Sequence, residues 1–384
     1  MTSYRKIDEV PIAGTPDGSA AFENGQAVEF AASKQKTLGF YGRDTGSAAH
    51  SNGRVPAFLG LAERTGGVYL ENPPSVREAL ERTHLDFQVE LLPHITERVT
   101  LTEDGVTTER VELPHKRTTT AVFRDGRPSV GFESVSPGYT PVQNGDGLSM
   151  GENIAGGSLV ALGAFGQPVG ARTYAAFKLD EGLSVGGKDG NGDPYDLFVT
   201  VINSHDKSFG LTVTLAPIRL GCTNQTYATF GGKLQPKYSI RHTAGATEKV
   251  DEIRRALGLF DQWEAAFAGM AEELLATQMN VDAFMRYQHK VLMVPEDQDQ
   301  LTQRQRQIVK VRDDELLQIL HSQTNAFGEG TAYAGYNALV EYSDFAARVK
   351  GGDGGRELTR MTRIMSGQTE KLKDRAWALA MAAA

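Results

Sequence analysis

Apolar and polar residues alternate in the middle of the chain, which is the pattern of half-buried β-strands. In residues 209–217 the alternation is strict, and it should place Leu211, Val213 and Leu215 on one buried face. Similar runs predict three further strands, at residues 158–165, 171–179 and 197–203. Residues 204–208 form a short connection, so the strands on either side of them are predicted to pair as a hairpin.

The preceding stretch is predicted to hold one helix followed by a β-meander. Ser75 and Glu78 have the spacing of a capping box, in which each side chain bonds a free backbone N–H at the start of a helix. Asp-Gly pairs at residues 104–105 and 125–126 are typical of tight turns between antiparallel strands. The strand-like runs around these turns lie at residues 87–91, 98–102 and 117–123.

From residue 247 the apolar positions recur every three or four residues, which is typical of amphipathic helices. Thr247 is the expected N-cap of a long first helix. Its apolar stripe is Val250, Ile253, Leu257, Phe260, Phe267, Met270 and Leu274. Further helices are predicted at residues 282–293, 301–321, 333–349 and 357–365.

Together these patterns predict an α+β fold, with antiparallel β-meanders and flanking helices followed by a helical C-terminal part. We expect three parts: an irregular N-terminal arm at residues 1–70, an antiparallel-sheet core at 71–245 and a helical region at 246–384. The first part is rich in Gly, Ala, Ser and Asn and shows little periodicity.

Composition favours a soluble cytoplasmic protein. No apolar run approaches the roughly 18 residues of a membrane span, and the N-terminus lacks the apolar stretch of a signal peptide. Cys222 is the only cysteine, which excludes an intramolecular disulfide and a cysteine-cluster zinc site. The formal net charge of −8 disfavours binding of nucleic acid, but residues 282–384 hold fourteen Lys and Arg against fourteen Asp and Glu. The C-terminal part is therefore better suited to bind a polyanion than the more acidic residues before it.

Several polar segments resemble the phage/plasmid-like protein family. They are residues 138–144 (Gly-Tyr-Thr-Pro-Val-Gln-Asn), 203–206 (Asn-Ser-His-Asp), 219–224 (Arg-Leu-Gly-Cys-Thr-Asn), 241–243 (Arg-His-Thr) and 330–338. The resemblance spans about residues 75–345 and implies a gene of a phage, prophage or plasmid, but no activity. Lys207 stands where the family usually has Gly after His-Asp, so this loop is predicted to need no positive φ.

The His205-Asp206 segment has two interpretations. His205 could activate the thiol of Cys222 as a nucleophile, although a hairpin with His205 in its turn separates the two residues by roughly 30 Å. In the other interpretation, Asn203 and Asp206 are turn formers that bond nearby backbone N–H groups. Cys222 is then a small buried apolar residue.

Arg219, Asn224, Arg241 and His242 lie at the ends of predicted strands. They could hold a phosphate or a base edge at the rim of the sheet, or they could fix the corner between sheet and helices through buried hydrogen bonds. The glycine-rich residues 351–355 lack the Lys-Ser/Thr of a P-loop, and the eight histidines show no ligand spacing. We therefore expect no cofactor and no metal.

Three groups of basic residues are candidates for binding a polyanion. Arg356, Arg360 and Arg363 recur at i, i+4 and i+7 and should share one helix face. The other two groups are Arg304, Arg306, Lys310 and Arg312, and Lys116, Arg117, Arg124 and Arg127. Such tracks can hold a nucleic-acid strand by its phosphates, but they can equally be ordinary surface charge or an oligomer contact.

The order of helix, hairpin meander and long helix is similar in outline to the Rad52-like single-strand annealing proteins, which implies a ring-shaped oligomer with a groove for DNA. The leading hypothesis is a non-enzymatic, oligomeric protein of mobile-element DNA metabolism that binds single-stranded nucleic acid. One alternative is a phage structural or host-defence-interacting protein that binds no nucleic acid. The other is a hydrolase, which requires His205, Asp206 and Arg219 to meet in one pocket.

Overall fold

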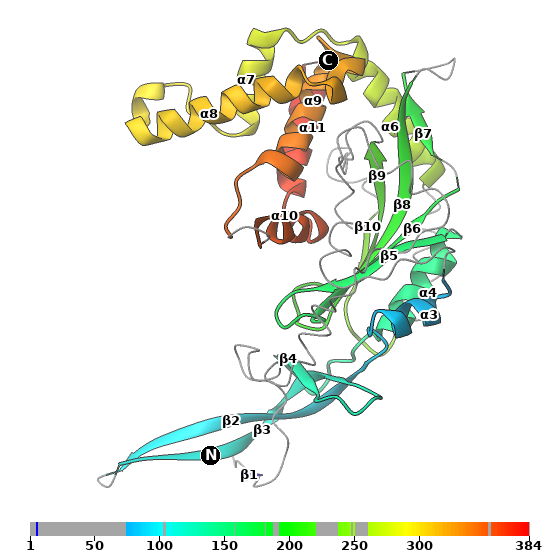
Figure 1. Cartoon of the computed structure of the whole chain (residues 1–384), viewed down its shortest axis with the longest axis vertical. Helices are drawn as coiled ribbons and strands as arrows, with labels where there is room; N and C mark the ends of the chain where they lie inside the picture. Colours follow the sequence, from blue (N-terminus) through cyan, green and yellow to red (C-terminus); the bar gives the residue numbers. More distant parts are fainter. Residues whose placement is uncertain are drawn as a thin grey trace.

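A computed structural model of the chain describes residues 5–6, 74–102, 105–156, 158–180, 182–186, 192–219, 237–246, 249, 260–351 and 355–383. The described residues form two antiparallel sheets and a group of helices (Figure 1). Helices cover both faces of the larger sheet, while the smaller sheet extends away from it.

The smaller sheet is dominated by two long strands, β2 (Gln88–Thr102) and β3 (Gly105–Val122), which we call the arm. The arm projects from the rest of the molecule (Figure 1). β1 (Arg5–Lys6) and β4 (Val130–Val135) pair with the other edge of β3, so β2 is an edge strand among the strands described. Toward its tip the arm exposes the apolar side chains of Val99, Leu101 and Val106.

The arm confirms the predicted meander but corrects its division into strands. The runs at residues 87–91 and 98–102 are not separate, because β2 continues through both. Pro93 does not end the strand: it lies on an edge strand, where a missing N–H is tolerated, beside a register shift between Pro93 and Ile95. Gly105 and Gly126 have positive φ at the predicted turns.

The larger sheet confirms the four strands predicted in the middle of the chain. Its order is β10 (Lys237–Ile240), β9 (Leu211–Arg219), β8 (Asp193–Ser204), β6 (Arg172–Lys178) and β5 (Ser158–Phe165), with β7 (Leu183–Val185) beside β8. β8 and β9 form the expected hairpin, in which Val201 lies opposite Val213. Leu211, Val213 and Leu215 are buried as predicted.

Two helices cover one face of this sheet. α3 (Val76–Arg82) begins at Ser75, whose hydroxyl accepts a hydrogen bond from the Glu78 backbone N–H, which is one half of the predicted capping box; the Glu78 carboxylate pairs with Arg82. α4 (Asn144–Ala155) packs on β5, β6 and β8 and buries Leu148 against them. α4 was not expected from the sequence, because its glycines and polar residues have low helix propensity.

Gly151 explains why α4 forms against this sheet. A Cβ atom at position 151 would lie 2.4 Å from Val201 Cγ2 and 2.7 Å from Phe177 Cε2, so only glycine allows the helix to approach this closely. Glycine therefore lowers the local propensity for helix but permits the packing that stabilises α4.

We expect Gly151→Ala to lower the free energy of unfolding by about 1–3 kcal/mol, because the added methyl group overpacks the interface. Gly269→Ala is the matched control: it lies inside α6 (Phe260–Ala276), and its Cβ would have no neighbour within 4 Å. That variant should gain roughly 0.5–1 kcal/mol from helix propensity. Urea unfolding of both variants measures the difference, and equal changes in the two would contradict the packing argument.

The helical region packs at one end of the sheet and over its second face. Its helices are α6, α7 (Val281–Val291), α8 (Gln303–Leu320), α9 (Ala332–Glu341) with a π-helical turn at Tyr342–Ala346, α10 (Gly355–Met365) and α11 (Glu370–Met381). Phe267, Phe284 and Trp377 form a core with Tyr195 and Leu215 of the sheet. Met361, Ile364 and Met365 of α10 pack on the face opposite α4.

The α+β class and the helical C-terminal region are confirmed. α7, α8, α9 and α10 lie where helices were predicted, and α11 was not predicted. Thr247, the expected N-cap, and most of residues 1–70 lie outside the described residues, so the limits at residues 70 and 245 stay predictions. Within the described part of the chain, no helix has the length and apolarity to span a membrane.

Candidate functional site

Three of the five polar segments singled out in the sequence meet at the base of the arm. Residues 138–144 lead into α4, residues 203–206 end β8, and residues 241–243 follow β10. His205 and His242 lie with their ring centroids 6.4 Å apart, and Tyr139 stacks on His242 at 5.2 Å. We call His205, His242, Tyr139 and Asn144 the histidine cluster.

His205 is fully buried at the junction of the two sheets. Its ring Nε2 is 2.9 Å from Asn144 Oδ1, and its carbonyl oxygen accepts a 2.7 Å hydrogen bond from Thr119 of β3. Phe87 and Phe132 enclose the ring, with centroids at 6.1 and 5.7 Å. The residue therefore ties the base of the arm to the larger sheet.

Hydrogen bonds fix the proton position on both imidazoles. The amide of Asn144 donates to the Leu85 carbonyl oxygen, so its Oδ1 faces His205 and Nε2 of that ring must donate. The Val142 backbone N–H donates to His242 Nδ1, so this ring carries its proton on Nε2. The remaining nitrogens, His205 Nδ1 and His242 Nε2, are buried and have no hydrogen-bond partner among the described residues.

Both imidazoles are held neutral. Burial lowers the pKa of His205 to about 3 and that of His242 to about 4, because a charged ring would lose its hydration. Burial also raises the pKa of Tyr139. For Asp206 burial would raise the pKa, but hydrogen bonds from Ser208 and Arg172 outweigh it and hold the pKa below its usual value. The two imidazoles of the cluster are therefore uncharged at neutral pH.

The loop after His205 is a structural turn, in agreement with one of the two interpretations of the sequence. Asp206 Oδ1 accepts from the Ser208 backbone N–H at 3.1 Å, and Asn203 Oδ1 accepts from the Ser204 backbone N–H at 3.0 Å. The prediction that this loop needs no positive φ is wrong, because Lys207 has φ 60°. The hydrogen bonds around it impose a conformation that a side chain other than glycine adopts only at a cost.

Arg219 fixes the corner between the larger sheet and the helices, as the second interpretation proposed. It is buried at the end of β9, where its guanidinium pairs with Asp193 and donates to Asn325 Oδ1 at 3.2 Å. The guanidinium also lies 5.6 Å from the centre of the Tyr333 ring, and the Tyr333 hydroxyl donates to Asp193. Tyr333 belongs to the fifth polar segment, residues 330–338, so that segment meets Arg219 here.

The residues of the hydrolase hypothesis do not meet in one pocket. Arg219 contacts Asp193 at the start of β8, whereas His205 and Asp206 follow its end. The 12 residues of β8 span roughly 36 Å at about 3.3 Å per residue. Cys222 and Asn224 lie outside the described residues, and Arg241 is exposed. In the described part of the chain, no group of three or more His, Cys, Asp and Glu is placed to hold a metal ion.

The basic residues of the arm and its base are mixed with carboxylates. Arg117 lies 3.8 Å from Glu112, and Arg127 lies 2.7 Å from Asp125. Lys116 is exposed. Arg124 lines a hollow of about 550 Å³ between α3 and α4, together with Arg77, Glu81, Asp86 and Asp146. Carboxylates outnumber the guanidinium groups in this hollow, which disfavours the binding of a polyanion there.

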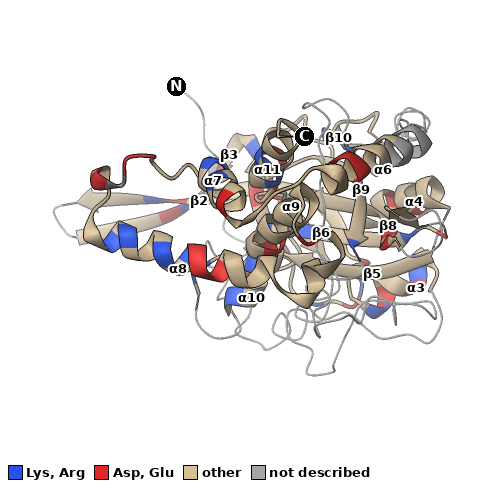
Figure 2. Cartoon of the chain, turned by 90° about the horizontal axis from the view of Figure 1, so that it is seen from above, with Lys and Arg blue, Asp and Glu red and all other residues tan. Residues whose placement is uncertain are grey.

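The basic residues of α8 face carboxylates of the same region. Arg306 pairs with Asp299 at 3.4 Å and Lys310 with Asp314 at 2.8 Å, while Arg304 is exposed. Figure 2 shows Lys and Arg on α8 next to Asp and Glu of the same helix. Figure 1 places α8 and the arm at opposite ends of the long axis, so these two groups do not form one track.

α10 keeps the most continuous positive charge. Arg356 and Arg360 donate to the backbone carbonyl oxygens of Gly351 and Ala347. The segment 348–363 contains five basic residues, including exposed Arg348 and Lys350, against the two acids Asp353 and Glu357. We call this segment the α10 basic segment.

Sequence reasoning missed the residues that complete both polar junctions. Thr119 bonds the His205 carbonyl oxygen, Arg172 pairs with Asp206 in the turn after it, and Asp193 and Asn325 hold Arg219. Asn144 ends a segment that was singled out, but its contact with His205 was not predicted. Asp193 and Asn325 lie in stretches without a distinctive pattern, and only the fold brings them to Arg219.

Comparison with known proteins gives one match, over residues 131–377, to the family described as a domain of unknown function, DUF932. The match begins in β4 and ends in α11, so it includes the larger sheet, the histidine cluster, the Arg219 corner and the α10 basic segment. No curated protein and no solved structure matches the chain.

Proposed function

Because the chain belongs to the DUF932 family, whose domain has no known function, we propose a role from its own geometry: it is a non-enzymatic protein of phage or plasmid DNA metabolism that binds single-stranded nucleic acid. The α10 basic segment is the binding surface. The mobile-element context rests on the resemblance of the polar segments to the phage/plasmid-like proteins.

The observation that carries this proposal is the charge of the α10 basic segment. Five basic residues against two acids give this stretch a net charge of +3 in a chain of net charge −8. A local positive surface can attract phosphates although the whole chain is acidic. The other two basic groups contribute less, because Arg117, Arg127, Arg306 and Lys310 have carboxylate partners.

The test is binding of a labelled oligothymidylate, followed by fluorescence anisotropy at low and high salt. If about three phosphates are neutralised, affinity should fall roughly twentyfold between about 50 and about 200 mM salt, because each contact with the single strand releases counterions. Arg356→Glu combined with Arg363→Glu should weaken binding at least about tenfold and flatten the salt dependence. Arg360 is left unchanged because it is half-buried where it donates to the Ala347 carbonyl oxygen, whereas Arg356 is exposed.

Arg304→Glu combined with Lys310→Glu is the matched control, because it changes the net charge equally on exposed positions of α8. That variant should keep the affinity of the wild type within about threefold. Absent binding, or binding that does not depend on salt, would exclude the proposed function.

A second candidate function is assembly without nucleic acid, which the arm favours. β2 is an edge strand, and the tip exposes Val99, Leu101 and Val106, with Leu101 81% accessible. Free strand edges with apolar side chains pair readily with other chains. Mass photometry with and without the oligothymidylate separates the candidates: an oligomer whose mass does not change on adding the strand supports assembly alone.

A further inference from the structure

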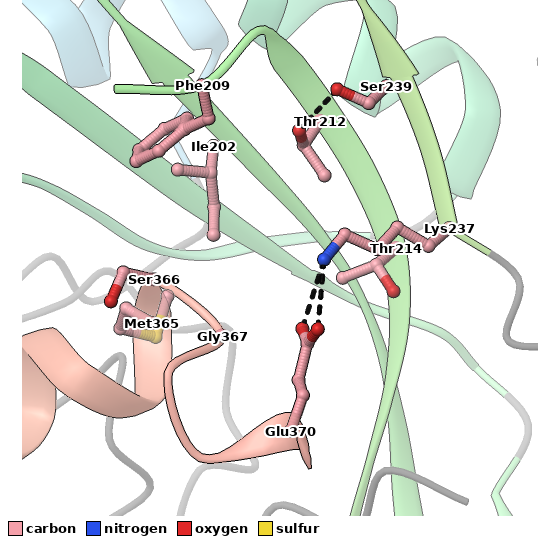
Figure 3. Close-up of a pocket in the computed structure, with 10 residues that line it drawn as sticks. All are labelled: Ile202, Phe209, Thr212, Thr214, Lys237, Ser239, Met365, Ser366, Gly367 and Glu370. Atoms are coloured by element: carbon pink, nitrogen blue, oxygen red, sulfur yellow. Dashed lines mark hydrogen bonds and ion pairs between the residues drawn. The ribbon is translucent and has the colours of Figure 1, made fainter. Parts of the chain in front are cut away.

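A pocket of about 260 Å³ lies on the α10 face of the larger sheet (Figure 3). β8, β9 and β10 form one side, and the end of α10 with the start of α11 forms the other. Ile202, Phe209 and Met365 give it apolar walls. The volume is near the lower end of small-ligand sites, which suits one planar ring system.

The polar rim of this pocket has one dominant feature, the ion pair of Lys237 and Glu370. Lys237 Nζ lies 3.1 Å from each carboxylate oxygen of Glu370. Both side chains are partly exposed, at 38% and 21%, so separating them for a ligand costs little. Thr212 and Ser239, joined by a 3.1 Å hydrogen bond, add hydroxyl groups to the same side.

Gly367 holds Glu370 at the rim. It has φ 75°, and a Cβ at this position would lie 2.6 Å from Glu370 Oε1. The turn between α10 and α11, whose positive φ favours glycine at position 367, therefore carries Glu370 to the rim of the pocket. The same turn follows Arg363 by four residues, which places the pocket beside the end of the α10 basic segment.

We propose that this pocket binds a guanine base of the strand held by the α10 basic segment. The inference rests on the proposed function and specifies which base of the bound strand the protein prefers. Bases of single strands are recognised by apolar contact with their faces and by hydrogen bonds to their Watson–Crick edges. Phe209 and Met365 supply apolar surface, and Lys237 and Glu370 supply a donor beside an acceptor.

Guanine fits this pair better than the other bases. Its Watson–Crick edge carries two neighbouring N–H donors, at N1 and N2, and the acceptor O6. A carboxylate accepts two parallel N–H groups in a bidentate arrangement, and an ammonium group donates to O6. Adenine, cytosine and thymine each offer the Glu370 carboxylate a donor at only one position of this edge, so a second carboxylate oxygen would lose its partner.

The experiment compares an oligothymidylate of roughly 15 nucleotides with the same strand carrying one central guanine. The guanine strand should bind to the full chain roughly fivefold to a hundredfold more tightly, because this is the range by which one bidentate contact distinguishes the correct base from a wrong one. Glu370→Gln should reduce this ratio to about one while binding of the oligothymidylate stays within about threefold, because the amide keeps one acceptor oxygen and sets an NH2 donor against the second N–H group of guanine.

Glu81→Gln is the matched control, because Glu81 also pairs with a cation on the surface, Arg77, at 2.8 Å, but far from the pocket in the fold. It should retain the guanine preference. Free guanosine monophosphate forms a separate arm of the experiment. If it binds to the wild type and not to Glu370→Gln, while the two strands bind equally, the pocket takes a free nucleotide and the inference for the strand is overturned.

The two proposals fail in different ways. If the oligothymidylate does not bind at all, the proposed function fails. If it binds with the expected salt dependence, but one guanine gives no preference or Glu370→Gln leaves the preference unchanged, the guanine pocket fails and the α10 basic segment remains.

Discussion

Replacing Arg219 with methionine is expected to lower the free energy of unfolding by about 3–5 kcal/mol, because it leaves the Asp193 carboxylate buried without its cation. Arg219 is 1% exposed and Asp193 5%, so neither charge can be hydrated in the folded state. The Tyr333 hydroxyl still donates to Asp193, but one hydrogen bond does not replace an ionic partner. The loss should appear as a lower midpoint of urea unfolding.

Two further variants separate burial of charge from loss of side-chain volume. Adding Asp193→Asn to Arg219→Met should restore at least about half of the lost free energy, because no charge then remains in the corner. Arg77→Met removes an exposed guanidinium, which pairs with Glu81 on α3, and should leave the midpoint of urea unfolding nearly unchanged. A cost below about 1 kcal/mol for Arg219→Met would show that the corner contributes little to stability.

Acidification should destabilise the protein well above the range in which carboxylates titrate. In the unfolded chain His205 and His242 take up a proton near pH 6.5, whereas in the folded chain their pKa values are about 3 and about 4. Between these limits the unfolded state binds more protons, so stability falls as the pH falls. The slope is about 1.4 kcal/mol per pH unit for each imidazole, and it should flatten below pH 4 as His242 charges in the folded state.

His205→Gln should roughly halve this slope between pH 6 and pH 4, because one of the two titrating rings is gone. The exposed His115 provides the control: His115→Gln also removes one imidazole but does not open the buried cluster. Urea unfolding at a series of pH values measures the slopes. A wild-type stability that stays constant from pH 6.5 to pH 4.5 would contradict the sealed, neutral state of both rings.

Local patterns were sufficient to predict most of the fold. The alternation around Val213 and the cap at Ser75 each report on neighbours in the sequence, and the structure buries Val213 and caps α3 at Ser75 as expected. The polar face of the same strand, with Thr212 and Thr214, is buried as well, which the alternation did not predict. Local patterns did not predict α4, because its stability comes from the packing of Gly151 against Val201 and Phe177 of the sheet. A propensity scale assigns glycine a free-energy cost in a helix, and it contains no information on the close packing against the sheet that glycine permits.

The candidate site was less predictable, because partners distant in sequence decide what each polar residue does. His205 and His242 were singled out, but their burial and neutrality depend on Asn144, Phe132 and Val142 from other elements. The basic groups show the same limit: Lys310 and Arg356 look alike in the sequence, yet one pairs with Asp314 and the other binds the Gly351 carbonyl oxygen.

The length of the arm affects how the size of the protein in solution must be measured. The 15 residues of β2 reach roughly 50 Å at about 3.3 Å per residue, and residues 96–102 at its outer end are exposed. A monomer of 41.6 kDa with such a projection has a larger hydrodynamic radius than a sphere of equal mass. It should therefore elute early from a gel-filtration column, and an early peak would not by itself indicate a dimer.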